Sequence, residues 1–342
     1  MQNLNIQTDI PLQNFNTLGI QVNAQHFMRL KDPRVLQSIL TNDHWRPIPK
    51  FILGGGSNIL FTKDYPGLVI KNEISGIEII DENNDHIYLK IGAGENWHQF
   101  VMHCVQNQLG GVENLSLIPG TVGAAPMQNI GAYGVEIRSV FHSLDAVELA
   151  TGKHVTFGNT QCKFGYRNSI FKNTHKDRFV ITHVTLHLNK KAILNTSYGA
   201  LQQTLEDRGI KSPTIRSVSE AVIEIRQTKL PDPKTIPNAG SFFKNPFIPS
   251  NDLEKLLEKY PDMPNFSLDD GHYKIPAAWL IEQCGWKGKR HGSVGVHDQQ
   301  ALVLVNHDHT DGNDVKKLAQ DIQKSVLETF NISLSPEVNI IE

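Results

Sequence analysis

The run Gly54-Gly55-Gly56-Ser57-Asn58 restricts the possible folds of this chain more than any other segment does. The apolar residues on both sides, 51–53 and 59–61, are typical of short strands. Consecutive glycines let backbone N–H groups approach an anion, since no Cβ stands in the way. No Gly-Lys-Ser/Thr follows, which excludes a P-loop, and a Rossmann fingerprint would open a helix instead of a second strand. The run therefore predicts an anion cradle or, alternatively, a tight hairpin turn.

Residues 119–134 form a second stretch of small residues, with four glycines and three alanines among 16 positions. A loop of this length without structure of its own is uncommon in a compact domain and is usually functional. A flexible linker is the alternative, but Ile118, Val122 and Ile130 would be unusual in a solvated linker. The composition favours a backbone that lies directly against a flat or charged ligand.

Hydrophobic periodicity predicts the remaining elements. In the first half we expect strands at 68–70 and 87–91, a helix at 97–105, a hairpin of 144–149 with 154–157, and a strand at 180–188 with one buried face. Two prolines at 228–234 indicate an extended connection and a domain boundary. Beyond it we expect helices at 253–260, capped by Ser250 or Asn251, at 277–284 and at 315–330, and a strand at 301–305. The pattern indicates an α+β chain with a strand-rich front and a mixed rear domain.

Charge and cysteine content restrict the partners and the compartment. The 342 residues carry 33 basic and 35 acidic side chains, a net charge of -2, whereas a binder of nucleic acid normally shows a basic excess. We therefore expect a small-molecule partner and no nucleic acid. The three cysteines are far apart and form no C-x-x-C pair, which indicates reduced thiols in the cytoplasm. No secretory signal and no long apolar span is visible, so no membrane association is expected.

Several polar residues are candidates for chemistry. Arg167 lies in a segment bounded by aromatic residues and could offer a forked donor to a carboxylate or enolate, although a surface arginine is the simpler interpretation. Ser241 is outside any G-x-S-x-G motif, so by itself it is most simply interpreted as a turn serine. Glu337 by itself is most simply interpreted as a solvated acid near the end of the chain. His307-Asp308-His309 lacks the spacing of a zinc motif, so no metal is expected.

Taken together, short motifs along the chain resemble one enzyme family. The motifs are residues 16–20, the GGGSN run, GAGENWH at 92–98, IPGTVGAAPMQNIGAYGVE at 118–136, CKFGYRNSIFK at 162–172, KLPDPK at 229–234, NAGSFFKNP at 238–246 and PEV at 336–338. In this combination and order they resemble the UDP-N-acetylenolpyruvoylglucosamine reductases. The resemblance extends from about Asn14 to Val338.

The resemblance implies a fold and a division into domains. The fold class would be α+β, with an FAD-binding domain of the vanillyl-alcohol oxidase and p-cresol methylhydroxylase type and a C-terminal substrate-binding domain. The FAD-binding domain would have lobes at 1–75 and 76–228, with FAD held noncovalently by a region of about 20–191. The substrate domain would span 229–331, and residues 332–342 would return to the active site. The segment around Tyr198 is similar to the insertion of the longer subclass, whose tyrosine closes over the substrate's diphosphate. A monomer is expected.

The resemblance also implies a reaction. NADPH would reduce the flavin at N5, and the reduced flavin would pass hydride to C3 of the enolpyruvyl group of enolpyruvyl-UDP-N-acetylglucosamine. The product would be UDP-N-acetylmuramate, a precursor of bacterial peptidoglycan, so the protein would serve cell-wall formation, cell shape and cell division. Arg167 and Glu337 would stabilise the enolate-like charge, and Ser241 would deliver a proton to C2.

Binding residues follow from the same motifs. FAD contacts are expected from Gly54, Gly55, Gly56, Ser57, Asn58, Ile118, Pro119, Gly120, Gly123, Ala124, Asn129, Gly131 and Ile181. Substrate contacts are expected from Tyr166, Tyr198, Lys229, Asn245 and Gln300. Ala124 and Ala125 depart from the family pattern, where a serine or glycine is frequent, so a hydroxyl contact to the FAD diphosphate would be lost there.

Two other functions remain as alternatives. An FAD-linked oxidase of a hydroxy acid or sugar could use the same fold, but it would leave Ser241 and Glu337 without a role. A nonenzymatic flavin- or nucleotide-binding protein would leave the segments around Arg167 and Ser241 without a purpose.

Overall fold

The computed structural model describes residues 4–268, 271–308 and 310–342, which form two compact units. Unit 1 contains the residues up to Ile10 together with 24–56 and 65–228. Unit 2 contains 11–23, 57–64 and 229–342. Two short pieces of the expected first lobe, 1–75, therefore belong to unit 2. The functional roles that we attached to the domains stay predictions.

The first sheet of unit 1 has the strand order β1-β2-β5-β3. Its strands are β1 (Gln7–Pro11), β2 (Asn23–Leu30), β3 (Lys50–Leu53) and β5 (Tyr65–Asn72). Both β2 and β3 run parallel to β5, where Phe27 and Phe51 are each in register with Val69. Helix α1 (Val35–Leu40) packs its apolar side against Leu68 and Ile70 of this sheet.

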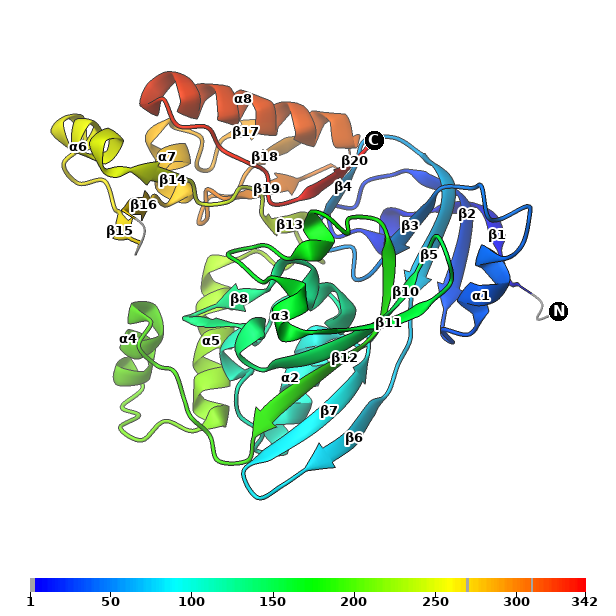
Figure 1. The fold of residues 1–342 in the computed structure, drawn as a ribbon. Coiled ribbons are helices and arrows are strands. Elements are labelled where there is room, and N and C mark those ends of the chain that lie inside the picture. The colour runs from blue at the N-terminus through cyan, green and yellow to red at the C-terminus, as the bar shows by residue number, and fades with distance from the viewer. Residues whose placement is uncertain (1–3, 269–270, 309) are drawn as a thin grey trace. The chain divides into compact units, whose positions relative to one another are not determined.

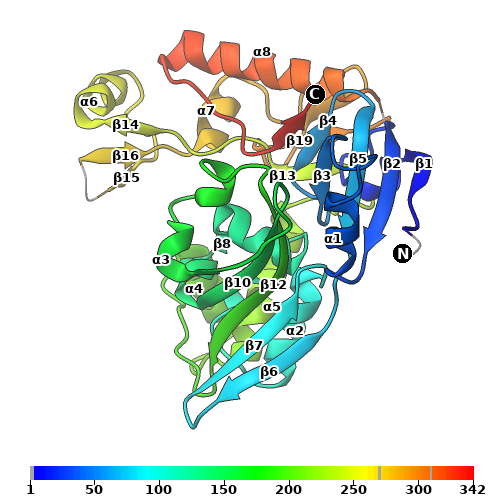
Figure 2. The ribbon, with the colours of Figure 1, turned by 45° about the vertical axis from the view of Figure 1, so that its right-hand side comes forward.

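The second sheet of unit 1 is antiparallel and has the order β11-β10-β12-β7-β6. Its strands are β6 (Ile77–Glu82), β7 (His86–Gly92), β10 (Phe141–Glu148), β11 (His154–Gly158) and β12 (Phe179–Asn189). Helix α2 (Trp97–Gln106) packs against one face of this sheet (Figures 1 and 2), and Trp97 and Phe100 share a core with Leu89 and Leu186. The predicted strands, hairpin and helix of this region are confirmed.

A β-bulge changes which side chains of β12 face this core. Asp145 pairs with His183 and Ala146 pairs with Ile181, so Thr182 is an extra residue on its strand. A bulge shifts the alternation by one position. Ile181 therefore joins the core of the five-stranded sheet, whereas Val180 belongs to the core around α1. The expectation of one continuous buried face was wrong at this end of the strand, because alternation alone does not reveal an inserted residue.

Two helices that we did not predict complete unit 1. They are α4 (Gly199–Asp207) and α5 (Ile215–Lys229). Leu201 and Leu205 of α4 pack against Val218 and Val222 of α5. An ion pair between Arg208 and Glu224 also links the two helices. The apolar residues of α5 recur at helical spacing, a signal that was present in the sequence. Shorter elements of unit 1 are β8 (Gly131–Ala132), β9 (Val135–Glu136), α3 (Asn159–Cys162) and 3-10 turns at Glu113–Leu115, Val122–Gln128, Ile137–Ser139 and Ile170–Lys172.

Unit 2 is built from two small sheets, a strand pair and three helices. The first sheet has the order β13-β19-β18-β17, with β13 (Asn238–Ser241), β17 (Arg290–His291), β18 (Val294–Val296) and β19 (Val303–Asn306). The second has the order β14-β16-β15, with β14 (Phe247–Pro249), β15 (Phe266–Ser267) and β16 (His272–Lys274). The helices are α6 (Ser250–Lys259), α7 (Ala277–Gln283) and α8 (Gly312–Phe330), and a 3-10 turn spans Gln13–Phe15. The three helices are confirmed, but α6 already begins at Ser250 after Pro249 and has no side-chain cap.

N-terminal segments are integrated into unit 2. Strand β4 (Ile59–Phe61) pairs in parallel with β20 (Asn339–Ile341), the last strand of the chain. Asn306 donates its side-chain N–H to the carbonyl of Leu18 at 2.9 Å, and the Asn238 N–H donates to the carbonyl of Thr17 at 2.9 Å. Unit 2 therefore requires parts of the chain that lie more than 200 residues apart.

The two glycine-rich segments differ from simple turns and linkers. Strands β3 and β4 belong to different sheets, so Gly54–Asn58 does not close a hairpin. Residues 119–134 contain a 3-10 turn and the β8–β9 pair, and Val122 and Ile130 are buried. The flexible linker is thus excluded, and so is a loop without structure of its own. Within the described residues, we find no helix that is both long and apolar enough to cross a membrane.

Candidate active site

In unit 1 the two glycine-rich segments lie directly against each other. A Cβ on Gly54 would stand 2.8 Å from the Thr121 hydroxyl, and one on Gly55 would stand 2.6 Å from the Cα of Gly120. Real Cβ atoms do not approach other atoms that closely, so a side chain at Gly55 would push the Gly120 backbone away, and one at Gly54 would displace the Thr121 hydroxyl. Gly56 adds a left-handed backbone with φ of +67°, which glycine adopts without strain. The predicted cradle is therefore formed by two loops rather than one.

The segment before α2 holds the second loop in place. The Ala93 carbonyl accepts the N–H of Gly123 at 2.9 Å, and the Glu95 carbonyl accepts that of Val122 at 2.9 Å. The N–H of Trp97 donates to the Gly120 carbonyl at 3.1 Å. Ala93 itself is anchored to the sheet, because its N–H donates to the carbonyl of Thr182 beside the bulge in β12. The bulge thus lies next to the loop that we predicted to bind the cofactor, and Ile181 precedes it directly.

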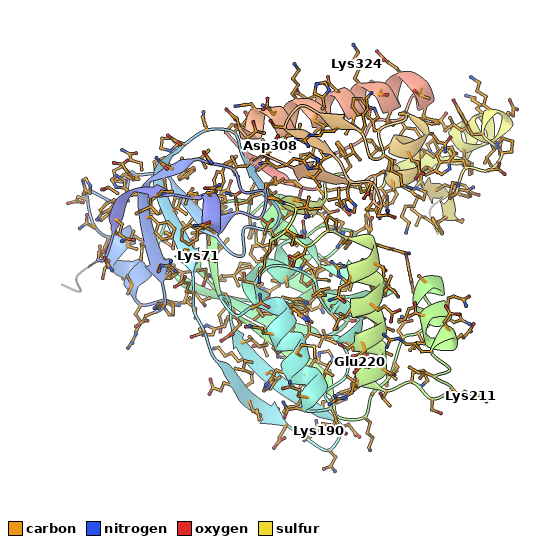
Figure 3. All side chains as sticks on the ribbon, turned by 180° about the vertical axis from the view of Figure 1, so that it is seen from behind. Lys71, Lys190, Lys211, Glu220, Asp308 and Lys324 are labelled. Carbon is orange, nitrogen blue, oxygen red and sulfur yellow. The ribbon has the colours of Figure 1, made fainter. Side chains whose placement is uncertain are left out.

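Lys71 is a basic residue at this loop that sequence reasoning missed. It lies near the end of β5, is labelled in Figure 3, and donates from Nζ to the carbonyl of Gly54. Burial lowers its pKa, with Glu73 opposing and Arg29 adding to the shift. A cation, closely packed backbone and flexible glycines together suit a diphosphate, the most anionic part of FAD. The residues present therefore fit the cofactor. A lysine after the apolar run 68–70 was the only sequence signal.

The remaining predicted cofactor residues differ in their burial and in their hydrogen bonds. Asn129 has φ of +47°, is buried, and donates its side-chain N–H to Glu136 and to the carbonyl of Gly165. Its side-chain Oδ1 accepts the backbone N–H of Arg138 at 3.2 Å. The side chain of Asn129 therefore holds neighbouring loops together. Ile118, Gly120, Ala124 and Gly131 are partly buried, whereas Pro119 is exposed.

Arg167 lies on a tight turn that Asn129 supports. Gly165 and Asn168 form a bridge across this turn, and Arg167 has φ of +50°, a strained value for a residue with a side chain. The Ser169 hydroxyl donates to the carbonyl of Met127 at 2.7 Å, which links the turn to the second glycine-rich loop. Arg167 is partly buried and Tyr166 is exposed. Strain of this kind is common where a side chain must be held in a functional position.

Tyr198 and Tyr133 form an aromatic contact in the same unit. Their ring centroids are 5.4 Å apart and nearly perpendicular, and Tyr198 precedes the first residue of α4 with half of its surface exposed. Asn114 donates to the backbone carbonyls of Tyr133 and Asn195 at 2.9 and 2.8 Å, so the two segments share one anchor. Arg226 of α5 hydrogen-bonds the Tyr133 hydroxyl, and sequence reasoning missed this arginine as well.

In unit 2 the structure brings Ser241, Glu337 and Asn58 close to one another. Ser241 ends β13 after Gly240, whose φ is +70°. The N–H of Glu337 donates to the carbonyl of Phe242 at 2.7 Å, and the Asn58 side chain donates to the carbonyl of Glu337 at 3.3 Å. Glu337 is buried with 8% of its surface exposed, so it is not the solvated terminal acid that its position suggested. A hydroxyl and a carboxyl group in adjacent segments can serve proton transfer.

The other predicted substrate residues of unit 2 lie in three different settings. Asn245 accepts the N–H of Ala277 at 2.9 Å and thereby caps α7. Gln300 lies in the turn before β19, and the Leu302 carbonyl in that turn accepts the N–H of Phe242 at 2.7 Å. Lys229 is exposed at the end of α5.

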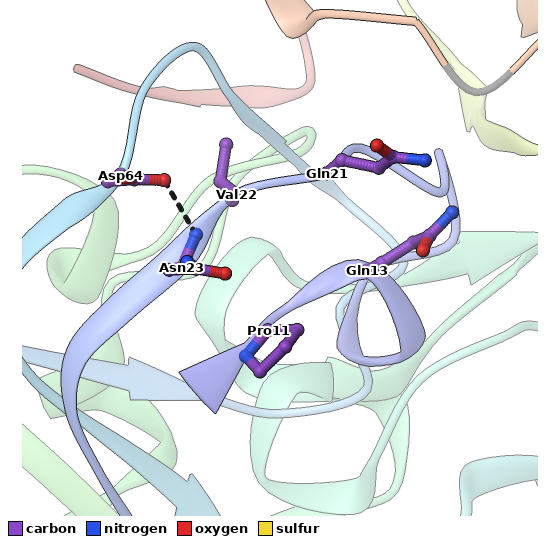
Figure 4. Close-up of a pocket in the computed structure, with 6 residues that line it drawn as sticks. All are labelled: Pro11, Gln13, Gln21, Val22, Asn23 and Asp64. Atoms are coloured by element: carbon purple, nitrogen blue, oxygen red, sulfur yellow. Dashed lines mark hydrogen bonds between the residues drawn. The ribbon is translucent and has the colours of Figure 1, made fainter. Parts of the chain in front are cut away.

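A small polar pocket in unit 2 contains none of the predicted site residues. It is lined by Pro11, Gln13, Gln21, Val22, Asn23 and Asp64 (Figure 4). Asp64 already accepts the N–H of Asn23 at 2.7 Å. The described residues contain no group of three or more histidine, cysteine or acidic side chains arranged to hold a metal ion. His309 of the His-Asp-His run lies outside the described residues.

Comparison with known proteins agrees with these features. Residues 232–341 match the family model for the C-terminal domain of UDP-N-acetylenolpyruvoylglucosamine reductase, and residues 24–158 match a model for an FAD-binding domain. The reductase of that name from Amoebophilus asiaticus is 51% identical, with 99% of this chain and 100% of that protein covered. The one from Pseudomonas aeruginosa is 45% identical, with 98% and 99% covered.

A solved structure supports the fold. The crystal structure of UDP-N-acetylenolpyruvylglucosamine reductase from Thermus caldophilus matches with a TM-score of 0.69 and 21% identity, covering 99% of this chain and all of that one. The predicted α+β fold class with an FAD-binding domain is therefore confirmed. Identity of about one half over the full length of named relatives leaves no room for a different family. The chain belongs to the UDP-N-acetylenolpyruvoylglucosamine reductases and is an oxidoreductase whose cofactor is FAD.

Proposed function

We propose that the protein reduces enolpyruvyl-UDP-N-acetylglucosamine to UDP-N-acetylmuramate with NADPH as the hydride donor, in the cytoplasmic synthesis of peptidoglycan precursors. The observation that supports this most is that the three residues proposed for catalysis come from family motifs and lie in segments with fixed local geometry. Arg167, Ser241 and Glu337 each lie in a family motif, and each is held by the tight local geometry described above. When bound, FAD would supply the chemistry of hydride transfer from NADPH to C3 of the enolpyruvyl double bond.

Unit 1 would hold FAD through its two glycine-rich loops. A Cβ on Gly55 would stand 2.6 Å from the Cα of Gly120, so the two backbones approach closely, and Lys71 donates to the Gly54 carbonyl. Backbone N–H groups that no Cβ covers can bind an anion. We infer that the FAD diphosphate binds here. The remaining predicted contacts, among them Ser57, Asn58 and Ile181, are part of the same proposal.

Arg167 would stabilise the negative charge that develops on C2 and on the carboxylate of the substrate. Its backbone turn is fixed by the Gly165–Asn168 bridge and by Asn129, which sets the point from which the side chain extends. A preorganised donor of this kind is commonly worth about 3–4 kcal/mol of transition-state stabilisation.

Ser241 would donate the proton from its Oγ to C2. A hydroxyl is a weak acid, so this role requires a strongly basic acceptor and little competing water. Ser241 is partly buried, and Glu337 is buried. The backbone of Glu337 is hydrogen-bonded to Phe242, the residue after Ser241, so its carboxyl group would orient the hydroxyl or supply a proton path. Lys229, Asn245, Tyr198 and Gln300 would bind the sugar nucleotide, with Tyr166 beside Arg167.

An anaerobic experiment on the two half-reactions tests this proposal. The purified protein should be yellow, lose its colour with NADPH, and regain it only with the enolpyruvyl sugar nucleotide. Ser241→Ala should slow the second step by about 10²–10⁴-fold and leave flavin reduction nearly unchanged, because only the second step needs a proton at C2. Ser325→Ala, in helix α8, is the matched control.

Two results would contradict the proposal. Equal slowing of both half-reactions by Ser241→Ala would remove the proton-donor role. Recovery of colour with oxygen but not with the enolpyruvyl nucleotide would indicate an oxidase of the same fold instead.

A further inference from the structure

In unit 2 the end of the chain pairs with the segment that carries Ser241. Residues 242–244, which follow Ser241 directly, lie antiparallel to residues 335–337. The N–H of Glu337 donates to the carbonyl of Phe242 at 2.7 Å. On this side, the backbone of Glu337 is therefore held by the residue next to the proposed proton donor.

A second contact to the backbone of Glu337 comes from Asn58. The side-chain Nδ2 of Asn58 donates to the carbonyl of Glu337 at 3.3 Å, across 279 residues of sequence. The N–H and the carbonyl of Glu337 are thus both engaged, by two segments that lie far apart along the chain. Together they restrict the direction in which the side chain of this buried glutamate leaves the backbone.

Asn339 holds Asn58 in turn. It begins β20, which lies beside β4 (Figure 1), and it is in register with Ile59. Its backbone N–H and its side-chain Nδ2 both donate to the carbonyl of Asn58, each at 3.1 Å. A carbonyl oxygen has two lone pairs and can accept both donors. The backbone donor would be present with any residue but proline, whereas the second donor depends on the asparagine side chain.

The other end of this strand pair has the same arrangement. Thr62, the residue after β4, donates its N–H at 3.0 Å and its hydroxyl at 3.1 Å to the carbonyl of Ile341. Each end is thus held by one backbone donor and one side-chain donor on a single carbonyl. The ends differ because Asn58, the acceptor at one end, also donates to Glu337.

We propose that Asn339 is a positioning residue for Glu337 in the proposed reduction. Its side chain holds the backbone of Asn58, the side chain of Asn58 holds the carbonyl of Glu337, and this backbone sets the point from which the carboxyl group extends. Loss of the Asn339 donor loosens this series of contacts and misplaces the carboxyl group relative to Ser241, which slows proton delivery. The inference rests on the proposed function for the role of Glu337.

Anaerobic stopped-flow measurements on the FAD-loaded protein test this role. Asn339→Asp keeps the shape of the side chain but has no N–H to offer the Asn58 carbonyl. We expect reoxidation of the reduced flavin by the enolpyruvyl nucleotide to slow about 3- to 10-fold, with flavin reduction by NADPH changed less than about 2-fold. The solvent isotope effect on reoxidation in deuterium oxide should rise, because proton delivery becomes slower.

Thr62→Val is the matched control. It removes the side-chain hydrogen bond at the other end of the same strand pair and keeps the branched shape of the side chain. Its melting temperature should fall, but both half-reactions and the isotope effect should match those of the wild type. Equal slowing of reoxidation in Thr62→Val and Asn339→Asp would mean that Asn339 only fastens the strand, and this would overturn the proposal.

A double-mutant cycle tests whether Asn339 acts through Glu337. In a Glu337→Gln background, Asn339→Asp should slow reoxidation by less than about a further 2-fold, since the carboxyl group that it positions is gone. An undiminished effect in that background, equal slowing of both half-reactions, or an unchanged reoxidation rate would each overturn the proposal. If Asn339→Asp does not fold, Asn339→Ala is judged by the same criteria, because it also removes the donor.

Failure of the proposed function looks different from failure of this inference. Wild-type protein whose NADPH-reduced flavin is not reoxidised by the enolpyruvyl nucleotide would remove the proposed function, and the role of Glu337 with it. Wild-type protein that is reoxidised, with Asn339→Asp equal to it in rate and in isotope effect, would remove the inference alone.

Discussion

The cysteines illustrate how burial sets reactivity at single residues. Cys104 and Cys162 are buried, and burial raises the pKa of both thiols, that of Cys162 to about 12. Cys284 is partly exposed near Thr329. Because the thiolate is the reactive form, the two buried groups should be inert at neutral pH.

We therefore expect a thiol reagent to modify one cysteine in the native protein and three after denaturation. Mass spectrometry of the labelled protein should locate the native label at Cys284. Cys284→Ser should abolish the native reaction. Rapid labelling of Cys162 in the folded protein would contradict the burial argument.

Histidine burial predicts how stability depends on pH. Burial lowers the pKa of His187 below its ordinary 6.5, and the charges of His86 and His142 add to this shift. Below about pH 6.5 the unfolded chain thus binds more protons than the native one, so the free energy of unfolding falls as the pH drops through this range. Above pH 6.5 the contribution is fully present.

His187→Gln should accordingly flatten the pH dependence of the denaturation midpoint between pH 7 and pH 5. Urea unfolding at each pH is the measurement, and the exposed His154→Gln is the control. An equal slope in the wild type and His187→Gln would refute the prediction.

At the scale of elements, the proposed cofactor site depends on the close contact between the two glycine-rich loops. Gly55→Ala would place a Cβ 2.6 Å from the Cα of Gly120, so the loops would have to separate. We expect the variant to lose most of its bound FAD, by at least about tenfold in affinity, since a shift of one loop removes several amide contacts.

Flavin absorbance of the purified protein and titration of the apoprotein with FAD measure this effect. Gly199→Ala is the matched control, because a Cβ there meets nothing within 4 Å and the residue begins a helix. Full flavin occupancy in Gly55→Ala would show that the loops can separate without loss of the cradle.

At the scale of the whole molecule, unit 2 is stable only if distant parts of the chain meet. Gly312 starts α8 so close to β4 that a Cβ would stand 1.7 Å from the carbonyl oxygen of Phe61. The Asn313 side chain donates to the carbonyl of Thr62, the residue after β4, at 2.9 Å. Strand β20 pairs with β4. One small region thus joins α8, the end of the chain and an N-terminal strand.

Gly312→Ala should lower the free energy of unfolding by about 1–3 kcal/mol, as other overpacked positions do. Thermal unfolding followed by circular dichroism measures the change, and Lys317→Ala on the exposed side of α8 is the control. A melting temperature equal to that of the control would mean that α8 does not need this close approach.

The sequence by itself determined much of the local structure and the chemistry. Periodicity located β7, β10, α2, α7 and α8, because alternation and helical spacing depend on residues that are close along the chain. Motifs along the chain identified the family and the three residues proposed for catalysis. The glycine runs indicated a cradle, although either run alone also fitted a turn or a linker.

Only the tertiary structure decided which residues meet. The bulge at Thr182 moved Ile181 into the core, and no periodic pattern marks an inserted residue. Lys71 and Arg226 showed no motif, and they donate to the carbonyls of Gly54 and Leu117, which lie 17 and 109 residues away. Glu337 became a buried group because β20 pairs with β4. Local conformation follows from near neighbours, whereas burial and charge environment follow from long-range pairing, which a single sequence does not show.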